Sequence, residues 1–314
     1  MHRTLSPAGA FWLAAFTYFI WGFTFLASRI AQDYGTPFVL LFWRFALAFV
    51  LLNLLRLTGR FPVRLHGRRL WPVLLAGLFE PVLYFPCEQY GLKLTSTSFS
   101  GVMVALIPLC SLVYGAVFLH EKATWRQVVF SVLSVAGVIV LAVYATGIGA
   151  GSFLGFLILL GTVFAGAGYI VACRACSGSF TAFERTYITC GMGAAAFGVL
   201  SVLEHRHGLS AVVLPMTHAP FALAIVFLSV VASVLSYLAL NRALEVLPVA
   251  RTAALINFST VVSVLAGVLL LREPFGWVSA VASAAILVGI WGVQRFAAPT
   301  VPDTAETTEP LPPS

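Results

Sequence analysis

The chain has 314 residues, of which 60% are hydrophobic and 9% are charged, and its formal net charge is +7. A soluble domain carries roughly 25% charged residues, so this composition excludes a water-soluble globule and predicts that lipid surrounds most of the protein. The basic residues cluster in short gaps between apolar runs, which is typical of a membrane protein and argues against a nucleic-acid partner.

Ten apolar runs follow one another along the chain, and each has about the 20 residues that a helix needs to cross ~30 Å of hydrocarbon. Helices are the expected spanning form, because strands would need closure into a barrel and a period-2 pattern. The sequence therefore predicts an all-α integral membrane protein of ten transmembrane helices. Residues 298–314 are expected to form a disordered cytoplasmic tail. The runs cover approximately residues 11–31, 37–57, 70–92, 97–119, 125–145, 152–173, 180–203, 220–241, 249–271 and 275–296.

The loop between the second and third runs sets the expected orientation. Lys and Arg concentrate in cytoplasmic loops, and this loop region contains Arg56, Arg60, Arg64, Arg68 and Arg69. The loops that fall on the opposite side contain fewer basic residues. We therefore expect a multi-pass protein of the bacterial cytoplasmic (inner) membrane, with both termini in the cytoplasm.

The two halves of the chain are similar when one is shifted by about 152 residues. Residues 1–146 and 147–297 are thus predicted to be two repeats of five helices each. Because five is odd, the second repeat enters the membrane in the opposite sense, which lets a transporter adopt two related conformations. Chance similarity between apolar segments is the alternative explanation. The matched pairs include Gly115 with Gly267, Glu121 with Glu273, Trp125 with Trp277 and Gly137 with Gly289.

The second and third runs contain ionisable residues, and each charge inside a span costs roughly 2.5–3.5 kcal/mol unless it has a partner or a cavity. Glu80, Tyr84 and Glu88 are spaced four residues apart and are expected to share one helix face. Arg44 lies near the depth of Glu88, so we expect these two residues to pair. The pair is either a gate, the charged end of a substrate site, or a structural ion pair between helices. Glu80 is the candidate proton carrier, which makes protons the candidate coupling ion.

Further polar and aromatic residues inside the runs are candidates for the wall of the same cavity. The alternative is that they only pack helices together through interhelical hydrogen bonds. Arg185, the approximate repeat mate of Arg44, and Asn241 are expected near the inner face, where they would form a gate. The full set of substrate-binding candidates is Tyr18, Trp21, Arg44, Glu80, Tyr84, Glu88, Tyr169, Ser233, Tyr237 and Asn257.

Short motifs stand in a fixed order over nearly the whole chain. They are Trp21-Gly22, Pro37, Arg44, Leu83-Tyr84-Phe85, Glu88, Gly91-Leu92, residues 95–98, Pro108-Leu109, Glu121, Ala243-Leu244, Pro248, Glu273-Pro274 and Gly289. Through these motifs the sequence resembles the EamA-type transporters of the drug/metabolite transporter superfamily. The resemblance implies a ten-helix carrier of small metabolites, in which helices 1, 3, 4, 6, 8 and 9 surround a cavity. Thr260 stands where a proline is common in that family, so a proline kink shared by both halves is not expected.

The sequence has no Walker A loop, Rossmann fingerprint or H-E-x-x-H motif, so we expect no enzymatic activity, cofactor or metal site. Without an ATP-binding domain, the energy for transport must come from a gradient. We therefore predict a secondary transporter of a small organic metabolite, an amino acid or related compound, that works by alternating access. Its expected direction, export (efflux), is implied by the family resemblance alone. The transporter should act as a monomer or a homodimer. The alternatives are an intramembrane enzyme, which would need a cluster of His, Asp or Ser near one face, and a scaffold, which would need a sizeable cytoplasmic module.

Overall fold

The computed structural model of the protein describes residues 6–107, 109–110, 113–114, 124–147, 152–176, 179–244 and 249–296. Within these residues the chain is helical and has no strand, in agreement with the predicted all-α class. The helices, in chain order, are α1 (Pro7–Gly22), α2 (Thr24–Gln32), α3 (Pro37–Leu57), α4 (Trp71–Gly77), η1 (Leu78–Leu83), α5 (Tyr84–Leu94), α6 (Thr97–Val104), α8 (Trp125–Gly147), α9 (Phe153–Cys176), α10 (Ala182–Glu204), α11 (Ser210–Val213), η2 (Leu214–Thr217), α12 (Ala219–Val226), η3 (Phe227–Leu235), α13 (Ser236–Leu244), α14 (Val249–Leu270) and α15 (Trp277–Arg295).

Four helical stretches are long and apolar enough to cross a membrane: Ala8–Gln32, Pro37–Leu57, Phe183–Glu204 and Ala219–Leu240. Shorter apolar helices cover Trp125–Leu141, Phe153–Tyr169, Ser259–Leu270 and Trp277–Val293. Each of them overlaps one predicted apolar run, while the count of ten spans stays a prediction. The predicted tail, residues 298–314, lies outside the described residues.

Helix starts follow capping signals that are present in the sequence. The hydroxyl of Thr36 accepts a hydrogen bond from the backbone at the start of α3, and Ser96 does the same for α6. Thr181 caps α10, where Glu184 completes a capping box by accepting the backbone N–H of Thr181. Pro37 occupies the first position of α3, where the missing N–H costs no intrahelical bond.

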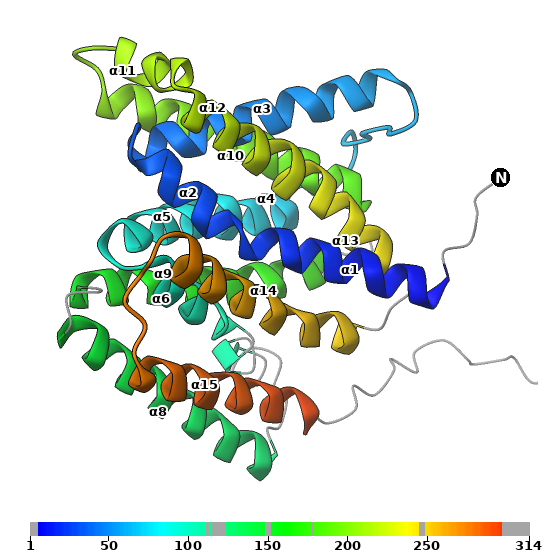
Figure 1. The fold of residues 1–314 in the computed structure, drawn as a ribbon. Helices are drawn as coiled ribbons and strands as arrows, with labels where there is room; N and C mark the ends of the chain where they lie inside the picture. The colour runs from blue at the N-terminus through cyan, green and yellow to red at the C-terminus, as the bar shows by residue number, and fades with distance from the viewer. Residues whose placement is uncertain are drawn as a thin grey trace, which may run out of the picture.

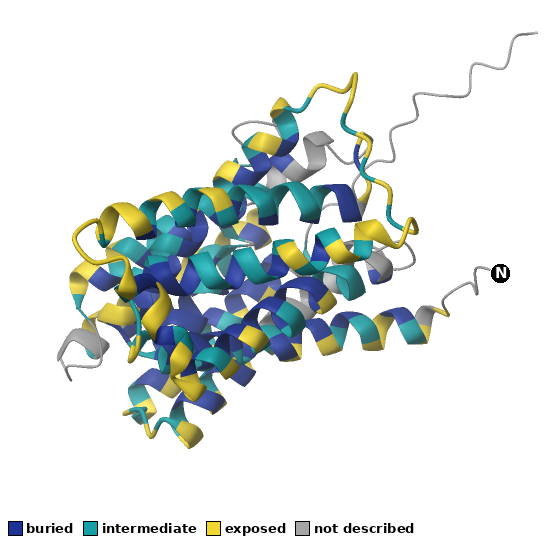
Figure 2. Cartoon of the chain, turned by 90° about the horizontal axis from the view of Figure 1, so that it is seen from above, coloured by how far each residue is buried: buried dark blue, intermediate teal, exposed yellow. Residues whose placement is uncertain are grey.

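Helices that are far apart in the sequence lie side by side in the bundle (Figure 1). α3 packs along α10, α5 along α9, and α1 along α13 and α14, while α8 and α15 pair at one edge. Buried residues gather along the inner faces of the helices, and exposed residues occupy loops and outer surfaces (Figure 2). Trp12, Val132 and Trp277, on outer surfaces, are 70%, 64% and 78% exposed, as expected where the neighbour is lipid.

The packing of α8 against α15 is reciprocal between the two halves of the chain. A Cβ atom added to Gly137 in α8 would lie 2.9 Å from the carbonyl oxygen of Ala282 in α15. One added to its repeat mate Gly289 in α15 would lie 2.7 Å from the carbonyl oxygen of Phe130 in α8. Both glycines therefore allow a close approach of the two backbones, each from its own helix.

Several predicted membrane helices are interrupted along their length. A turn at Phe23 separates α1 from α2, and the π-helical segments η1 and η3 interrupt the third and eighth predicted spans. Within η1, Glu80 has φ −139° and ψ 112°, because a residue that precedes a proline is driven out of the helical region. The break takes Glu80 out of the helical phase of α5, so only Tyr84 and Glu88 keep the expected common face.

Glu273, in the segment between α14 and α15, caps the start of α6 from the other half of the chain. Its Oε1 accepts the N–H of Thr97 at 2.6 Å, and its Oε2 accepts the N–H and the hydroxyl of Ser98 at 2.8 and 2.7 Å. A carboxylate in this position also interacts favourably with the helix dipole. The repeat mate Glu121 lies outside the described residues.

Candidate functional site

A hydrogen bond between two interrupted helices lies at the centre of the candidate site. The hydroxyl of Tyr237 donates to Oε1 of Glu80 at 2.6 Å. Glu80 stands at the break before α5, and Tyr237 lies in the first turn of α13, directly after η3. The bond therefore joins the first half of the chain to the second where the helical backbone is irregular.

Arg44, from α3, is buried beside this bond with 3% of its surface exposed. Its guanidinium lies over the ring of Phe85, 4.4 Å from the ring centroid, and its Nε donates to the hydroxyl of Ser233 at 3.3 Å. Its Nη1 is buried and has no hydrogen-bond partner among the residues that the structure describes. Such a donor costs free energy unless something binds to it.

Glu88 is 4% exposed and takes its hydrogen bonds from its own helix. Gln89 Nε2 donates to its Oε1 at 2.9 Å, and the hydroxyl of Tyr84 is hydrogen-bonded to the same carboxylate. The predicted pairing of Arg44 with Glu88 is wrong for the part of the chain that the structure describes: no salt bridge joins them there, whereas Arg68 and Glu184 lie 3.1 Å apart. Arg44 acts on Glu88 and on Glu80 only as a nearby charge. The reason is local: the aromatic ring of Phe85 and the Ser233 hydroxyl bind the guanidinium instead.

Aromatic side chains from α1 extend this cluster. The ring of Trp21 lies 5.2 Å from that of Tyr237 and 5.5 Å from that of Tyr18, measured between centroids. Trp21 Nε1 donates to the carbonyl oxygen of Ala232 at 2.9 Å. That carbonyl belongs to η3, where the wider π-helical turn leaves backbone oxygens available to other donors. The predicted residues Tyr18, Trp21 and Tyr237 are thus brought together.

Hydroxyl groups on η3 and α13 form the remaining polar surface. The Ser233 hydroxyl donates to the carbonyl of Leu228 at 2.8 Å and accepts from Arg44, so it acts as both donor and acceptor. The buried hydroxyl of Ser229 has no hydrogen-bond partner in the described part of the chain. The bond from Arg44 to Ser233 therefore connects α3 to this segment of the second half.

The other predicted site residues have different positions. Tyr169 on α9 is half-buried and lies close to Tyr237, so it belongs to the same neighbourhood. Arg185 is half-buried in the first turn of α10, next to Glu184. The side chains of Asn241 and Asn257 lie outside the described residues, and their expected roles stay predictions, as does the gate expected from Arg185.

Three residues of the site were not singled out as candidate site residues in the sequence. Phe85 forms the platform for Arg44, Gln89 binds Glu88, and Thr17 in α1 donates to the carbonyl of Ser236 at 3.2 Å. Thr17 precedes Trp21 by four residues, a helical spacing that could have identified it. Phe85 stands in the motif Leu83-Tyr84-Phe85, which could have drawn attention to it, whereas Gln89 lies in no motif of the sequence.

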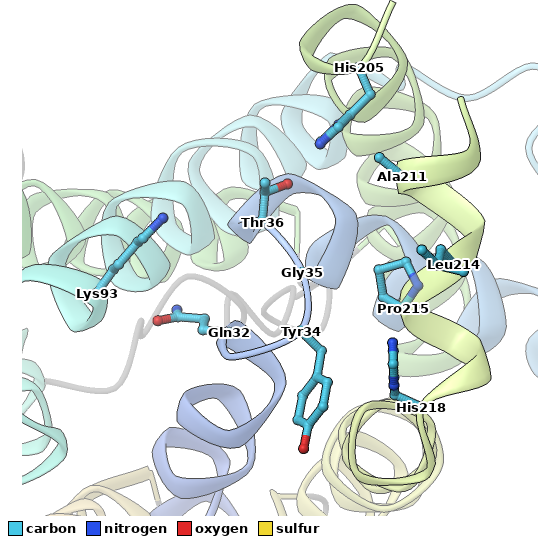
Figure 3. Close-up of a pocket in the computed structure, with 10 residues that line it drawn as sticks. All are labelled: Gln32, Tyr34, Gly35, Thr36, Lys93, His205, Ala211, Leu214, Pro215 and His218. Carbon is cyan, nitrogen blue, oxygen red and sulfur yellow. The ribbon is translucent and has the colours of Figure 1, made fainter. Parts of the chain in front are cut away.

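A surface pocket of about 380 Å³ lies near the ends of α2, α5 and α10. Figure 3 shows Lys93, His205 and His218 around the turn at Gly35 that leads into α3. Gln32, which lines this pocket, donates to Oε1 of Gln89 at 3.0 Å, and Gln89 in turn donates to Glu88. Two hydrogen bonds therefore connect the pocket to the buried carboxylate. The complete lining is Gln32, Tyr34, Gly35, Thr36, Lys93, His205, Ala211, Leu214, Pro215 and His218.

The interior cluster has the chemistry of a binding site for a small polar molecule. Carboxylates can accept hydrogen bonds from an ammonium group, a free guanidinium donor can bind a carboxylate, and the aromatic rings can enclose an apolar part. Among the described residues, no group of three or more His, Cys, Asp or Glu side chains could hold a metal ion.

The matching family model and two similar proteins are all described as transporters. The family model described as "EamA-like transporter family" matches residues 8–143 and 153–295. A Bacillus subtilis protein named uncharacterized transporter YcxC is 32% identical over 287 residues, which are 90% of this chain and 91% of that protein. An uncharacterized transporter of Archaeoglobus fulgidus is 26% identical over 90% of this chain and 97% of its own length. A solved crystal structure, 20% identical, covers 91% of this chain with a TM-score of 0.63, a likeness of fold alone.

Proposed function

Because the chain belongs to the EamA-like transporter family, we propose that it is a secondary carrier that exports a small organic metabolite, an amino acid or a related compound, by alternating access. The family and the names of both relatives support a membrane transporter rather than an enzyme. Together with the long apolar helices, they make the chain a multi-pass membrane protein. The substrate class, direction and mechanism are the proposed part.

The observation that carries the proposal is the cluster in which buried Arg44 and Glu88 lie near half-buried Glu80 and Tyr237. Ionisable groups in a membrane interior are costly and commonly mark a substrate or ion pathway. The free Nη1 of Arg44 suits a carboxylate, and the two glutamates suit an ammonium group. A zwitterionic compound would satisfy both kinds of group at once, which supports the amino-acid class. Glu80, held by one short bond to Tyr237, is the proposed proton carrier.

The proposed architecture has ten helices in two inverted repeats, residues 1–146 and 147–297. The reciprocal packing of Gly137 and Gly289 supports related halves. Interrupted helices near the interior cluster support alternating access, since carriers of this type place substrate sites at discontinuous helices. The distribution of Arg and Lys supports a cytoplasmic location for both termini in the inner membrane. A monomer or a homodimer is compatible with this arrangement.

Counterflow in reconstituted liposomes tests the proposal. Labelled amino acids and related compounds would be offered with and without a pH gradient, and at least one should accumulate. Glu80→Gln should slow that exchange about tenfold or more and remove its response to the gradient, since each lost charge-assisted bond contributes roughly 1.5–3 kcal/mol. Tyr237→Phe, which removes only the bonded hydroxyl, should have a smaller effect of the same kind.

Asp33→Asn is the matched control, because Asp33 is an exposed carboxylate at the end of α2. It should leave the exchange unchanged. If no compound exchanges, the proposed carrier function is wrong. If Glu80→Gln retains the full response to the pH gradient, Glu80 is not the proton site.

A further inference from the structure

The segment that connects α3 to α4, residues 58–70, lies on the bundle as a strap held by its apolar side chains. Phe61 stacks on Phe183 of α10 with ring centroids 4.9 Å apart. Val63 packs against the same core, and Leu65 packs against the small cluster that contains Phe180. We call residues 58–70 the arginine strap, because they contain Arg60, Arg64, Arg68 and Arg69.

Glu184 of α10 fixes the strap through hydrogen bonds. Its Oε1 accepts the backbone N–H of Arg64 at 2.9 Å, and its Oε2 accepts Nη1 of Arg68 at 3.1 Å. Arg68 also donates to the carbonyl of Ser179 at 2.9 Å. The Glu184 side chain is 2% exposed, so its charge is used inside this contact and does not neutralise the other arginines.

Three arginines of the strap take no part in these anchors. Arg60, Arg64 and Arg69 are exposed, and their side chains form no ion pair or hydrogen bond with any residue the structure describes. His66, between them, is also exposed. The half-buried apolar residues at 61, 63 and 65 alternate with exposed arginines at 60 and 64, so the strap leaves positive charge exposed beside its packed side chains.

The strap lies at the depth where lipid headgroups are expected. α3 has 21 residues, which at 1.5 Å per residue is about the thickness of the hydrocarbon layer. Leu57, the last residue of α3, is 80% exposed, and Trp71, the first of α4, is 62% exposed. An exposed tryptophan beside the end of a span is typical of the membrane interface.

We propose that the arginine strap is a binding site for anionic phospholipids, in which Arg60, Arg64 and Arg69 bind the headgroup phosphate. Guanidinium groups match phosphate oxygens with two parallel hydrogen bonds, and lysine cannot do this. Basic groups beside a span attract anionic lipids. The site requires only that the chain lies in a membrane, so its test does not depend on transport activity.

Quenching of Trp71 measures this binding. The full-length protein in neutral detergent is titrated with phosphatidylglycerol that carries brominated acyl chains, which quench tryptophan on contact. The Trp71→Phe variant gives the signal of the other tryptophans, which is subtracted. The triple variant R60Q/R64Q/R69Q should need roughly 10- to 100-fold more phosphatidylglycerol for half-maximal quenching. Brominated phosphatidylcholine should quench both proteins equally weakly.

A second triple variant, K93Q/R206Q/R295Q, removes the same charge from exposed residues outside the strap and should bind like the unmodified protein. Two outcomes would overturn the proposal. If all three proteins reach half-maximal quenching at the same phosphatidylglycerol concentration, the strap arginines do not contribute to binding. If both variants lose affinity equally, net charge alone explains binding.

Two other occupants would also overturn it. One is a soluble phosphate ligand, which is indicated if sn-glycerol 3-phosphate at constant ionic strength displaces the lipid at a similar concentration. The other is the acidic C-terminal segment of the chain itself. It is indicated if phosphatidylglycerol quenches Trp71 only in the variant D303N/E306Q/E309Q, in which that segment has lost its negative charges.

Discussion

Arg44 illustrates how a single buried side chain depends on its geometry as well as its charge. A planar guanidinium can stack on an aromatic ring and still donate along its edge, whereas a lysine ammonium is a compact point charge. In this protein one face of Arg44 lies on Phe85 and one edge reaches Ser233. The remaining edge, with the free Nη1, is the part that a bound molecule could use.

Arg44→Lys should therefore lower the rate of counterflow about tenfold although the positive charge is kept, because the stacking and the fixed hydrogen bond are both lost. Counterflow of the substrate found in liposomes gives the rate. Arg56→Lys is the control, since Arg56 lies on the same helix and makes its contact with Tyr187 near the exposed end. A rate for Arg44→Lys equal to that of the control would show that charge alone matters.

Sequence reasoning identified Arg44 and Glu88 but not their true partners. Depth along two helices predicts that the residues are near each other, and the structure agrees to that extent. Which residue a guanidinium contacts depends on helix rotation and on neighbours such as Phe85, and spacing along one chain does not encode either. The bond between Glu80 and Tyr237 was missed for the same reason, although both residues were candidates.

At the level of helices, the positions of proline explain one interruption and the absence of another. Pro81 follows Glu80 at the break, whereas α5 continues through Pro86. Pro86 lies six residues after the break, and the backbone of α5 stays helical through it. A proline count alone would have predicted two equal bends. The π-helical segment η3 has no proline or glycine in it, and the hydroxyls of Ser233 and Ser236 donate to its backbone carbonyls at Leu228 and Val231.

The close contact of α8 and α15 should be sensitive to any side chain at its glycines. Gly289→Val should destabilise the protein by about 1–3 kcal/mol, because the added atoms overlap the backbone of Phe130. Thermal unfolding in detergent, followed by circular dichroism, measures the loss. Gly208→Ala is the control, because no atom lies within 4 Å of a Cβ at Gly208. An unchanged midpoint for Gly289→Val would mean that the two helices are not packed this closely.

At the scale of the molecule, the helical class and the related halves could be predicted from composition and a fixed offset. Apolar runs of the right length indicate helices whatever their neighbours are, which is why the helices fall on the expected segments. Which helices pair, such as α3 with α10, could not be predicted, because apolar faces that meet lipid and those that meet protein have similar composition.

The orientation of the whole molecule is open to a direct test. A reporter that is active only in the cytoplasm should be active when fused after Ser314. The reason is that the basic residues between α3 and α4 are expected to hold their side of the protein, which also carries the C-terminus, in the cytoplasm. A second fusion at Arg206, in the segment after α10, should give the periplasmic signal. Signals of the same kind from both fusions would exclude the proposed topology.

The hydrogen bonds from the start of α6 to Glu273 could affect the maximal transport rate of the proposed carrier. If the proposed cycle separates α6 from the segment after α14, three hydrogen bonds must break and re-form at every turnover. Breaking charge-assisted bonds contributes an activation barrier that does not depend on which molecule is bound. This helix end would then limit the maximal rate for every substrate, independently of the proposed interior site.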